Sequence, residues 1–505
     1  MKSGSIHRSI QCDAALFLLV FVSLAAMSAR ARADAVTDWN VIAFNAAEAS
    51  GKGPVTSCDI AMAHVAMHDA LNAIDRRYEP YAYDAVAPEG ASPEAAIAAA
   101  AHDVLVARIP NQKALLDRAL ASALAAIPDG RAKVDGVETG RQSAAAIIAF
   151  RESNGSKDIT PYKPGNKNVL WRQTPPAFAQ AIGVGFGKVR PFTMTGVAQF
   201  DLPIPAYFDL RGAEYAADYN EVKMLGGALS RTRTAEQSEI ARFWYEPSPG
   251  VHIRLARELV IRRKMDPWQS ARLFALLHLA GADCMIVGYA DKYRYNFWRP
   301  VTAIRNGEND GNQRTAGDPA WMPYLETPNH PEYLSNHAVL CAAWAEILAR
   351  FFGTDQFSFT MTSARPYPGI KRSFNSFSQS AREAADSRVY AGVHFRSSCR
   401  DGLVIGHEIG SQTFERFLRP AFDPPAGVSW IDDFIASRFS NETGEAEFPL
   451  RQLNHGSDRI NDGFYRSSGF RAASTFFCNS SIFRTIAFIS SMSRVTCFFD
   501  SLSIL

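Results

Sequence analysis

The chain has 505 residues, of which 47% are hydrophobic, so it is long enough to bury a large core without support from disulfides or a structural metal. Lys and Arg number 53 and Asp and Glu number 51, which gives a formal net charge of +2. This balance excludes the lopsided basic surface of a general nucleic-acid binder, and we expect no nucleic-acid partner. The interior has no run of 18 or more apolar residues, so we expect no membrane span in the mature chain.

The N-terminus has the pattern of an export signal. Basic residues up to Arg8 precede an apolar run at Ala14–Met27, and Ala31-Arg32-Ala33 offers small residues around a cleavage site before Asp34. The run is short for a bilayer span and typical of a signal peptide. The alternative is an uncleaved membrane anchor. Cleavage predicts a secreted or periplasmic protein, and the spacing of the six cysteines that remain predicts no particular disulfide pairing.

Apolar residues then recur at helical spacing through most of the chain, and alternating strand patterns are almost absent. Two long loops rich in Pro and Gly, 158–208 and 306–333, interrupt the pattern. The predicted helices are Thr37–Ala49, Thr56–Ile74, Pro93–Arg108, Gln112–Ile127, Val134–Arg151, Arg211–Leu229, Thr234–Tyr245, His252–Arg263, Pro267–Tyr289, Ser335–Phe352, Phe374–Tyr390 and Asp401–Leu418. We therefore predict an all-α protein built of helical bundles.

Composition divides the chain into four parts. We expect a signal peptide at 1–33, an N-terminal helical bundle with wrapping loops at 34–250, a catalytic bundle at 251–425 and a C-terminal extension at 426–505. After about residue 464 the extension is rich in Ser and Phe and has no helical period. It is either a peripheral flap, a poorly ordered tail or an aberrant end of the gene, and we assign it no function.

The first chemical motif runs from Lys292 to Pro300. Lys292 and Arg299 lie seven residues apart among aromatic side chains that would shield them from water. Pro300 favours an extended Arg299, so we expect a helix to end nearby. Taken alone, the motif is more typical of two surface cations on an aromatic helix end.

The second motif is a loop that runs directly into a helix at Ser335-Asn336-His337. Ser335 is a suitable N-cap. Free backbone N–H groups at such a helix start favour an anion, and His337 in the first turn is suited to exchange a proton with it. The alternative is a simple Ser cap beside a packed His.

The third motif is Ser387-Arg388 followed by His394. Arg388 offers a planar fork of donors to an oxyanion. Six residues would place Arg388 and His394 on different faces of one helix, and Gly392 is suited to interrupt that helix. In isolation this is a surface Arg and a packed His. Together, the three motifs supply three cations, a helix start and two histidines, which suit a tetrahedral oxyanion such as phosphate or vanadate.

In this order and spacing, the three motifs resemble the superfamily of vanadium-dependent haloperoxidases and type 2 phosphatidic acid phosphatases, and in particular its secreted bacterial haloperoxidase-like members. The resemblance covers at least residues 267–418. It implies the family's fold of two helical bundles, with the site among the helices of the second. It also implies that Lys292, Arg299, Arg388, Ser335 and the backbone N–H of Asn336 bind the oxyanion, that His394 is the ligand of vanadate and that His337 is the acid/base.

Two positions depart from the family's motif. Asn336 stands where the family usually has Gly. Ser398 stands where the family often has an Asp that holds the ligand histidine. Asp401, seven residues after His394, would share its face of a helix and is expected to take over this role.

Export without a membrane bundle favours a haloperoxidase over a lipid phosphatase. The resemblance then implies vanadate as cofactor, with hydrogen peroxide, a halide and a small organic acceptor as partners. His330, seven residues before His337, resembles the bromoperoxidases, so bromide is the expected halide. Two alternatives stay open: an acid phosphatase that passes through phosphohistidine at His394, with phosphate as the group bound, and a degenerate protein that only binds oxyanions.

Overall fold

The computed structural model describes residues 34–155, 161–163, 165, 167–246 and 250–422. The predicted signal peptide and the C-terminal extension from residue 426 therefore lie outside the described residues. The described residues all fall within one compact unit. The division between an N-terminal and a catalytic bundle near residue 250 stays a prediction.

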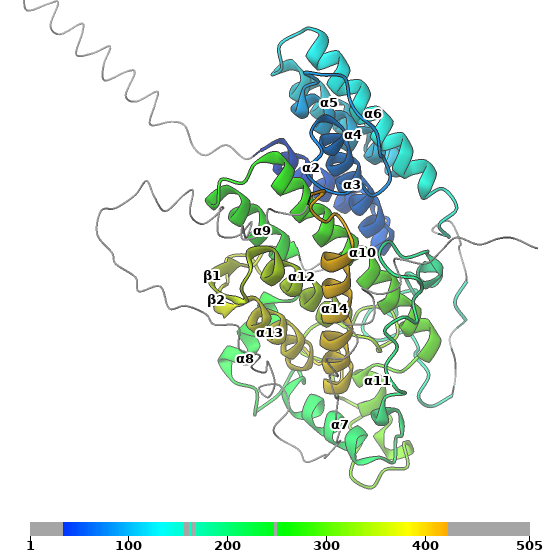
Figure 1. The fold of residues 1–505 in the computed structure, drawn as a ribbon. Coiled ribbons are helices and arrows are strands. Elements are labelled where there is room, and N and C mark those ends of the chain that lie inside the picture. The colour runs from blue at the N-terminus through cyan, green and yellow to red at the C-terminus, as the bar shows by residue number, and fades with distance from the viewer. Residues whose placement is uncertain (1–33, 156–160, 164, 166, 247–249, 423–505) are drawn as a thin grey trace, which may run out of the picture. The chain divides into compact units, whose positions relative to one another are not determined.

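The described chain is mostly helical, as predicted (Figure 1). The α-helices are α2 (Ala35–Ser50), α3 (Thr56–Ile74), α4 (Pro93–Arg108), α5 (Lys113–Ala125), α6 (Arg131–Phe150), α7 (Ala213–Leu225), α8 (Ala235–Phe243), α9 (Gly250–Arg262), α10 (Pro267–Tyr295), α11 (Pro300–Arg305), α12 (Asn336–Phe352), α13 (Phe377–Tyr390) and α14 (Arg396–Arg416). Short 3-10 turns are η1 (Gly53–Val55), η2 (Pro110–Gln112), η3 (Phe186–Lys188), η4 (Ala206–Phe208) and η5 (Gly307–Asn309).

Two elements were missed by the sequence patterns. One is the short helix α11. The other is an antiparallel hairpin of β1 (Gln356–Thr362) and β2 (Lys371–Ser376), in which Phe359 pairs with Phe374. We predicted that Phe374 begins a helix, which is wrong because it lies in β2 with its ring buried against Phe359.

The long helix α10 connects two groups of helices. It packs against α3, which also contacts α4 and α6, and against α12, which also contacts α13 and α14. One continuous cluster of buried side chains extends from Val36 to Leu418. Composition and length alone would allow α10 to cross a membrane, but 89% of its apolar window is buried inside the fold. It is therefore placed as a core helix of this structure.

Local chemistry sets the ends of α10. Asp266 accepts a hydrogen bond from the backbone N–H of Gln269 at 2.9 Å, and the Gln269 side chain accepts from the backbone N–H of Asp266. This reciprocal cap satisfies donors that the first helical turn leaves unpaired. Asn296 ends the helix in a left-handed conformation, and its N–H bonds the carbonyl of Lys292. The chain can then turn back so that Arg299 starts the next helix.

Glycines bring α14 close to α12. Gly402, Gly406 and Gly410 recur every fourth residue and face the α12 backbone. A Cβ on Gly406 would lie 2.1 Å from the carbonyl oxygen of Val339, which is far inside any real contact. The close approach fixes the start of α12, where Ser335 stands, beside the first turn of α14.

Candidate active site

The three motifs meet at the ends of four helices. Lys292 lies in the last turn of α10, Arg299 precedes α11, Ser335 precedes α12 and Arg388 lies in the last turn of α13. All four side chains are buried. His394 is buried with them, in the connection between α13 and α14. As predicted, the helix before it is interrupted: α13 ends at Tyr390, and Gly392 has a φ of +80°.

Arg299 joins two histidines of the site. Its Nη1 lies 3.0 Å from Nε2 of His394, and its Nη2 lies 2.9 Å from Nδ1 of His330. It also donates to the backbone carbonyls of His330 at 2.9 Å and Val393 at 2.7 Å. The extended backbone at Arg299, expected from Pro300, is observed at φ −80° and ψ 155°. Because the guanidinium is planar and has five donors, it can hold both rings at once.

His394 is oriented by a carboxylate that the sequence interpretation overlooked. Its Nδ1 lies 2.9 Å from Oε1 of Glu332, whose side chain is fully buried. The same oxygen accepts the backbone N–H of Phe395 at 3.0 Å, and Oε2 accepts the hydroxyl of Tyr207 at 2.7 Å. Since a carboxylate only accepts hydrogen bonds, this arrangement favours the tautomer with its proton on Nδ1. The lone pair of Nε2 then points away from the carboxylate, and in this structure it accepts a hydrogen bond from Nη1 of Arg299 at 3.0 Å.

The predicted supporting role of Asp401 is wrong in this geometry. A spacing of seven places two residues on one face only if both belong to the same helix, and α14 begins at Arg396, after His394. Asp401 instead accepts from the Tyr333 hydroxyl at 3.3 Å and from Nε of Arg400 at 3.2 Å. Ser398 Oγ lies 3.5 Å from Nδ1 of His394, farther than Glu332.

Lys292 is held by backbone carbonyls and lies near the buried carboxylate. Its Nζ donates to the carbonyl of Glu332 at 3.2 Å and also to that of Leu334. Burial lowers the pKa of Lys292, and the neighbouring Arg299 lowers it further. Burial raises the pKa of Glu332 to about 7, against the effect of Arg299 and its hydrogen-bond donors. Burial removes water from both side chains and so disfavours their charged forms, which lowers the pKa of the amine and raises that of the carboxyl.

Among the described residues, two buried donors at the site have no oxygen or nitrogen acceptor within hydrogen-bond distance. One is Nε of Arg388, whose Nη1 donates to the carbonyl of Trp244 at 3.1 Å. The other is the hydroxyl of Ser335, which lies beside the Cys399 thiol. Ser335 occupies the predicted N-cap position, but its side chain makes no capping hydrogen bond. A buried donor without an acceptor is costly, so both groups point to an acceptor that is not part of the chain.

His337 and Asn336 lie at the start of α12 and keep partial exposure to solvent. His337 Nε2 lies 3.2 Å from the carbonyl oxygen of Glu246. Burial lowers the pKa of His337, and the charge of Arg388 adds to this effect. Burial also lowers the pKa of His394, with Arg299 as the next cause. Both rings are therefore neutral near pH 7 and able to accept a proton or a ligand.

The charges at the site do not balance. Lys292, Arg299 and Arg388 place three buried cations around His394, and Glu332 is the carboxylate that hydrogen-bonds its ring. Buried charge is stable only when it is paired or solvated. Backbone carbonyls solvate the cations in part, and an anion with several oxygens would complete the pairing. The donor set therefore fits vanadate or phosphate.

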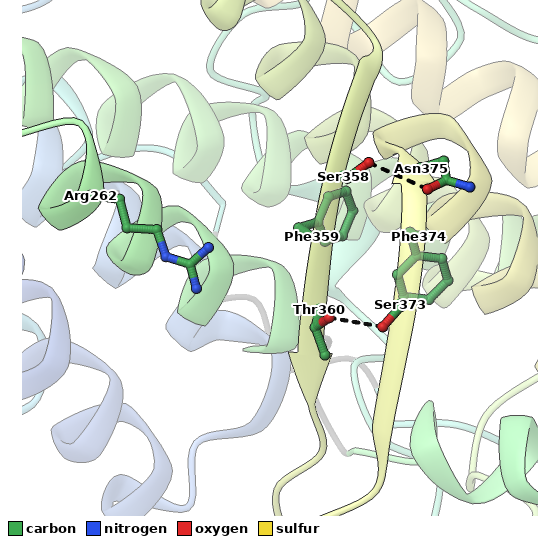
Figure 2. Close-up of a pocket in the computed structure, with 7 residues that line it drawn as sticks. All are labelled: Arg262, Ser358, Phe359, Thr360, Ser373, Phe374 and Asn375. Carbon is green, nitrogen blue, oxygen red and sulfur yellow. Dashed lines mark hydrogen bonds between the residues drawn. The ribbon is translucent and has the colours of Figure 1, made fainter. Parts of the chain in front are cut away.

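The C-terminal end of α9 and the β1–β2 hairpin form a depression whose lining residues are not those of the candidate site (Figure 2). Arg262 borders it, together with short polar side chains of the two strands. These are linked in pairs, Thr360 to Ser373 at 2.8 Å and Ser358 to Asn375 at 3.3 Å. The lining offers hydroxyls and one cation but no acid/base pair, so we place no chemistry there.

Comparison with known proteins gives the same assignment as the motifs. Residues 272–421 match the family model described as the VCPO second helical-bundle domain, a range that contains every predicted site residue. The predicted resemblance to the vanadium haloperoxidases is confirmed. Vanadium chloroperoxidase of Curvularia inaequalis is 29% identical over 182 residues, which cover 26% of this chain and 29% of that protein. The chain thus matches less than a third of the length of this curated relative.

Solved structures of vanadium haloperoxidases share the fold over more of the chain. A bacterial vanadium-dependent iodoperoxidase is similar with a TM-score of 0.66 and 26% identity, over 77% of this chain and 97% of that chain. A holo-type bacterial vanadium-dependent chloroperoxidase has a TM-score of 0.59 and 20% identity, over 72% of this chain and 92% of that chain. At 20% identity, the similarity to the chloroperoxidase shows a shared fold and nothing more. The chain therefore has the helical fold of the vanadium haloperoxidases.

Proposed function

We propose that this chain is a vanadium-dependent haloperoxidase that uses hydrogen peroxide to oxidise a halide, with bromide as the favoured substrate. The observation that carries the proposal is the buried group of Lys292, Arg299 and Arg388 around an Nε2 lone pair of His394. The unpartnered donors of Arg388 and Ser335 add to it. The structural likeness to a bacterial iodoperoxidase over 97% of that chain supports the same class of reaction.

The site residues take distinct roles in this proposal. Lys292, Arg299 and Arg388 bind the oxygens of vanadate, and His394 Nε2 is its protein ligand. Ser335 and the backbone N–H of Asn336 donate further hydrogen bonds at the start of α12. Bound vanadate supplies Lewis-acid activation of hydrogen peroxide toward the halide.

In this proposal His337 exchanges protons. Glu332 has a different role, because it holds the ring of His394 in place. In this structure Nε2 of His337 donates to the carbonyl of Glu246 at 3.2 Å, so Nδ1 is the ring atom that accepts a proton in this proposal. Glu332 holds the Nδ1 proton of His394, so that Nε2 stays unprotonated. The buried Tyr207 hydroxyl fixes the second oxygen of Glu332 and excludes water from it.

His330 supports bromide as the substrate. Its ring contacts Arg299, and it packs edge-on against Tyr289 with ring centroids 5.5 Å apart. It is therefore a buried polar side chain in contact with the cationic group, and in this proposal it contributes to the binding of bromide. Iodide is the matched comparison, because the relative with the higher TM-score is described as an iodoperoxidase.

The test is halide oxidation by the chain from Asp34 onward, with hydrogen peroxide and bromide, iodide or chloride. Activity is expected only after addition of orthovanadate, and H394A and H337A are each expected to lose it. A phosphomonoester assay on the vanadate-free protein runs in parallel. Phosphoester cleavage that vanadate inhibits, without halide oxidation, would move the protein to the phosphatase side of the superfamily. Full activity in either variant would overturn the role given to that histidine.

We also propose that the protein is exported and cleaved before Asp34. The support is the basic, apolar and small-residue order of residues 1–33. N-terminal sequencing of the mature protein is expected to begin at Asp34. A retained Met1 in a membrane fraction would identify an uncleaved anchor instead.

A further inference from the structure

The start of α12 is an edge of the candidate site that is partly exposed to solvent. His394, Ser335 and the three cations are buried, whereas Asn336 and His337 keep partial exposure. A small molecule released on this side of the site would pass the start of α12. The side chains that border this exit are the first that a reactive product meets.

Tyr245 stands at this exit. The carbonyl of Trp244 accepts Nη1 of Arg388 at 3.1 Å, and the carbonyl of Glu246 lies 3.2 Å from Nε2 of His337. Tyr245 lies between these two residues, so its backbone is anchored to the site on both sides. Its ring is half-buried, and burial and then Glu326 raise the pKa of its phenol against the effect of Arg388.

Further tyrosines surround Tyr245. We define the tyrosine cluster as Tyr245, Tyr324, Tyr367 and Tyr390, which pack on a small apolar group that includes Val393, the residue before His394. The rings of Tyr245 and Tyr367 have centroids 6.2 Å apart. Tyr390 also packs against the main core, and Val393 connects the cluster to His394 along the chain. It has no role in the reaction proposed above.

We propose that Tyr245 is a self-halogenation site, modified by the hypohalous acid that the enzyme produces. The inference rests on the proposed function, which supplies the hypohalous acid. A ring carbon next to the phenol carbon attacks the halogen and the halogen–oxygen bond breaks. The ring loses the proton from that carbon, which combines with the departing hydroxide as water. The products are 3-halotyrosine and water, so the ring is oxidised by two electrons and the halogen is reduced.

The environment of Tyr245 favours this substitution. Its hydroxyl donates to the backbone carbonyl of Glu326 at 3.1 Å. This donation increases electron density on the ring and activates the positions next to the phenol carbon. The hydrogen bond also holds the ring in one orientation, so a single ring edge is expected to react.

The experiment is peptide mapping by mass spectrometry after turnover with vanadate, hydrogen peroxide and bromide or iodide. Excess methionine is added to remove hypohalous acid from bulk solution. Tyr83, a partly exposed tyrosine whose hydroxyl bonds Gln142, is the internal control. Reagent hypohalite added to the resting protein, without peroxide, gives the labelling pattern of bulk reagent.

During turnover, the halogenated fraction of Tyr245 is expected to be about tenfold higher than that of Tyr83, because the hypohalous acid is released at high local concentration beside Tyr245. Reagent hypohalite is expected to label the two to similar extents. In Y245F the label is expected to move to Tyr367, with halide oxidation unchanged. Halide oxidation with equal labelling of Tyr245 and Tyr83 would overturn the inference and leave the proposed function standing. Absence of halide oxidation in the parallel acceptor assay would overturn both.

Discussion

Nδ1 of His394 and Oε1 of Glu332 lie 2.9 Å apart although 62 positions separate them in the sequence. The carboxylate that orients the ligand histidine thus comes from the loop before α12 and not from α14. Ser398 stands at the α14 position where the family often has an acid, and its hydroxyl reaches Nδ1 only at 3.5 Å. In this chain, the carboxylate that orients His394 therefore precedes α12.

Replacement of Glu332 by Gln tests this relationship. E332Q keeps the shape of the side chain but removes the charge that stabilises the Nδ1 proton of His394, so vanadate affinity is expected to fall about 10- to 100-fold. Affinity is measured by calorimetric titration with orthovanadate, with circular dichroism as the check on folding. The double variant E332Q/S398D returns a carboxylate near Nδ1 and is expected to recover part of the loss. Wild-type affinity in E332Q would show that Glu332 does not position His394.

Gly288 and Asn336 form a second coupled pair. A Cβ on Gly288 would lie 2.2 Å from Oδ1 of Asn336. Asn336 stands where the family's motif usually has glycine. Its side chain fits against α10 because Gly288 has no side chain there. G288A is expected to cost about 1 kcal/mol of stability through overpacking and to weaken vanadate binding, because the Asn336 side chain at the start of α12 must move aside.

A second substitution, N336G, tests whether Gly288 and Asn336 are coupled. N336G removes the side chain that clashes, so G288A/N336G is expected to regain most of the stability and vanadate affinity lost in G288A. Thermal unfolding and vanadate titration of all four combinations give the interaction energy. If N336G leaves the G288A defect unchanged, the defect arises from another contact of α10.

Helices were predictable where local chemistry decides them. Thr56–Ile74 and Pro93–Arg108 were predicted with the observed bounds, the second because Ser92 caps it and Pro93 suits its first position. The hairpin was missed because its alternation is short and its pairing, Phe359 with Phe374, joins two segments. Glu332 was missed for a similar reason. It acts on His394, which lies 62 positions away in the sequence, and the Pro-Glu-Tyr sequence around it has no periodicity that marks it.

The pH dependence of stability is expected to depend on Asp291. Burial raises the pKa of this carboxyl to about 7, and the nearby Asp201 adds to the effect. The folded protein therefore keeps the proton up to about pH 7, whereas the unfolded chain loses it near pH 4. Folding binds protons in this window, so the contribution of Asp291 to stability falls as pH rises from about 4 to about 7.

D291N removes this titration with little change in shape. Its stability relative to wild type is expected to be similar near pH 4 and higher at pH 8, by at most about 4 kcal/mol, because one pH unit is worth about 1.4 kcal/mol. Urea unfolding at pH 4.5, 6 and 8 gives the comparison. D84N is the control, because Asp84 has a side chain that is 74% exposed. An equal pH slope in D291N and wild type would contradict the prediction.

The contact between α12 and α14 is expected to be intolerant of one methyl group. A Cβ on Gly406 would lie 2.1 Å from the backbone carbonyl of Val339, which cannot move without shifting α12. G406A is therefore expected to lower the free energy of unfolding by about 2 kcal/mol or more, since overpacking costs about 1–3 kcal/mol and backbone cannot repack. Because Ser335 and His337 begin the same helix, vanadate affinity is expected to fall with stability.

G196A is the matched control for this prediction. A Cβ on Gly196 would have no atom within 4 Å, so the same chemical change is expected to leave stability within about 0.5 kcal/mol of wild type. Urea unfolding and vanadate titration are compared for both variants. If G406A were as stable as G196A, the helices would not be in the close contact described here. If it lost stability but kept full vanadate affinity, the start of α12 would not depend on the packing of α14.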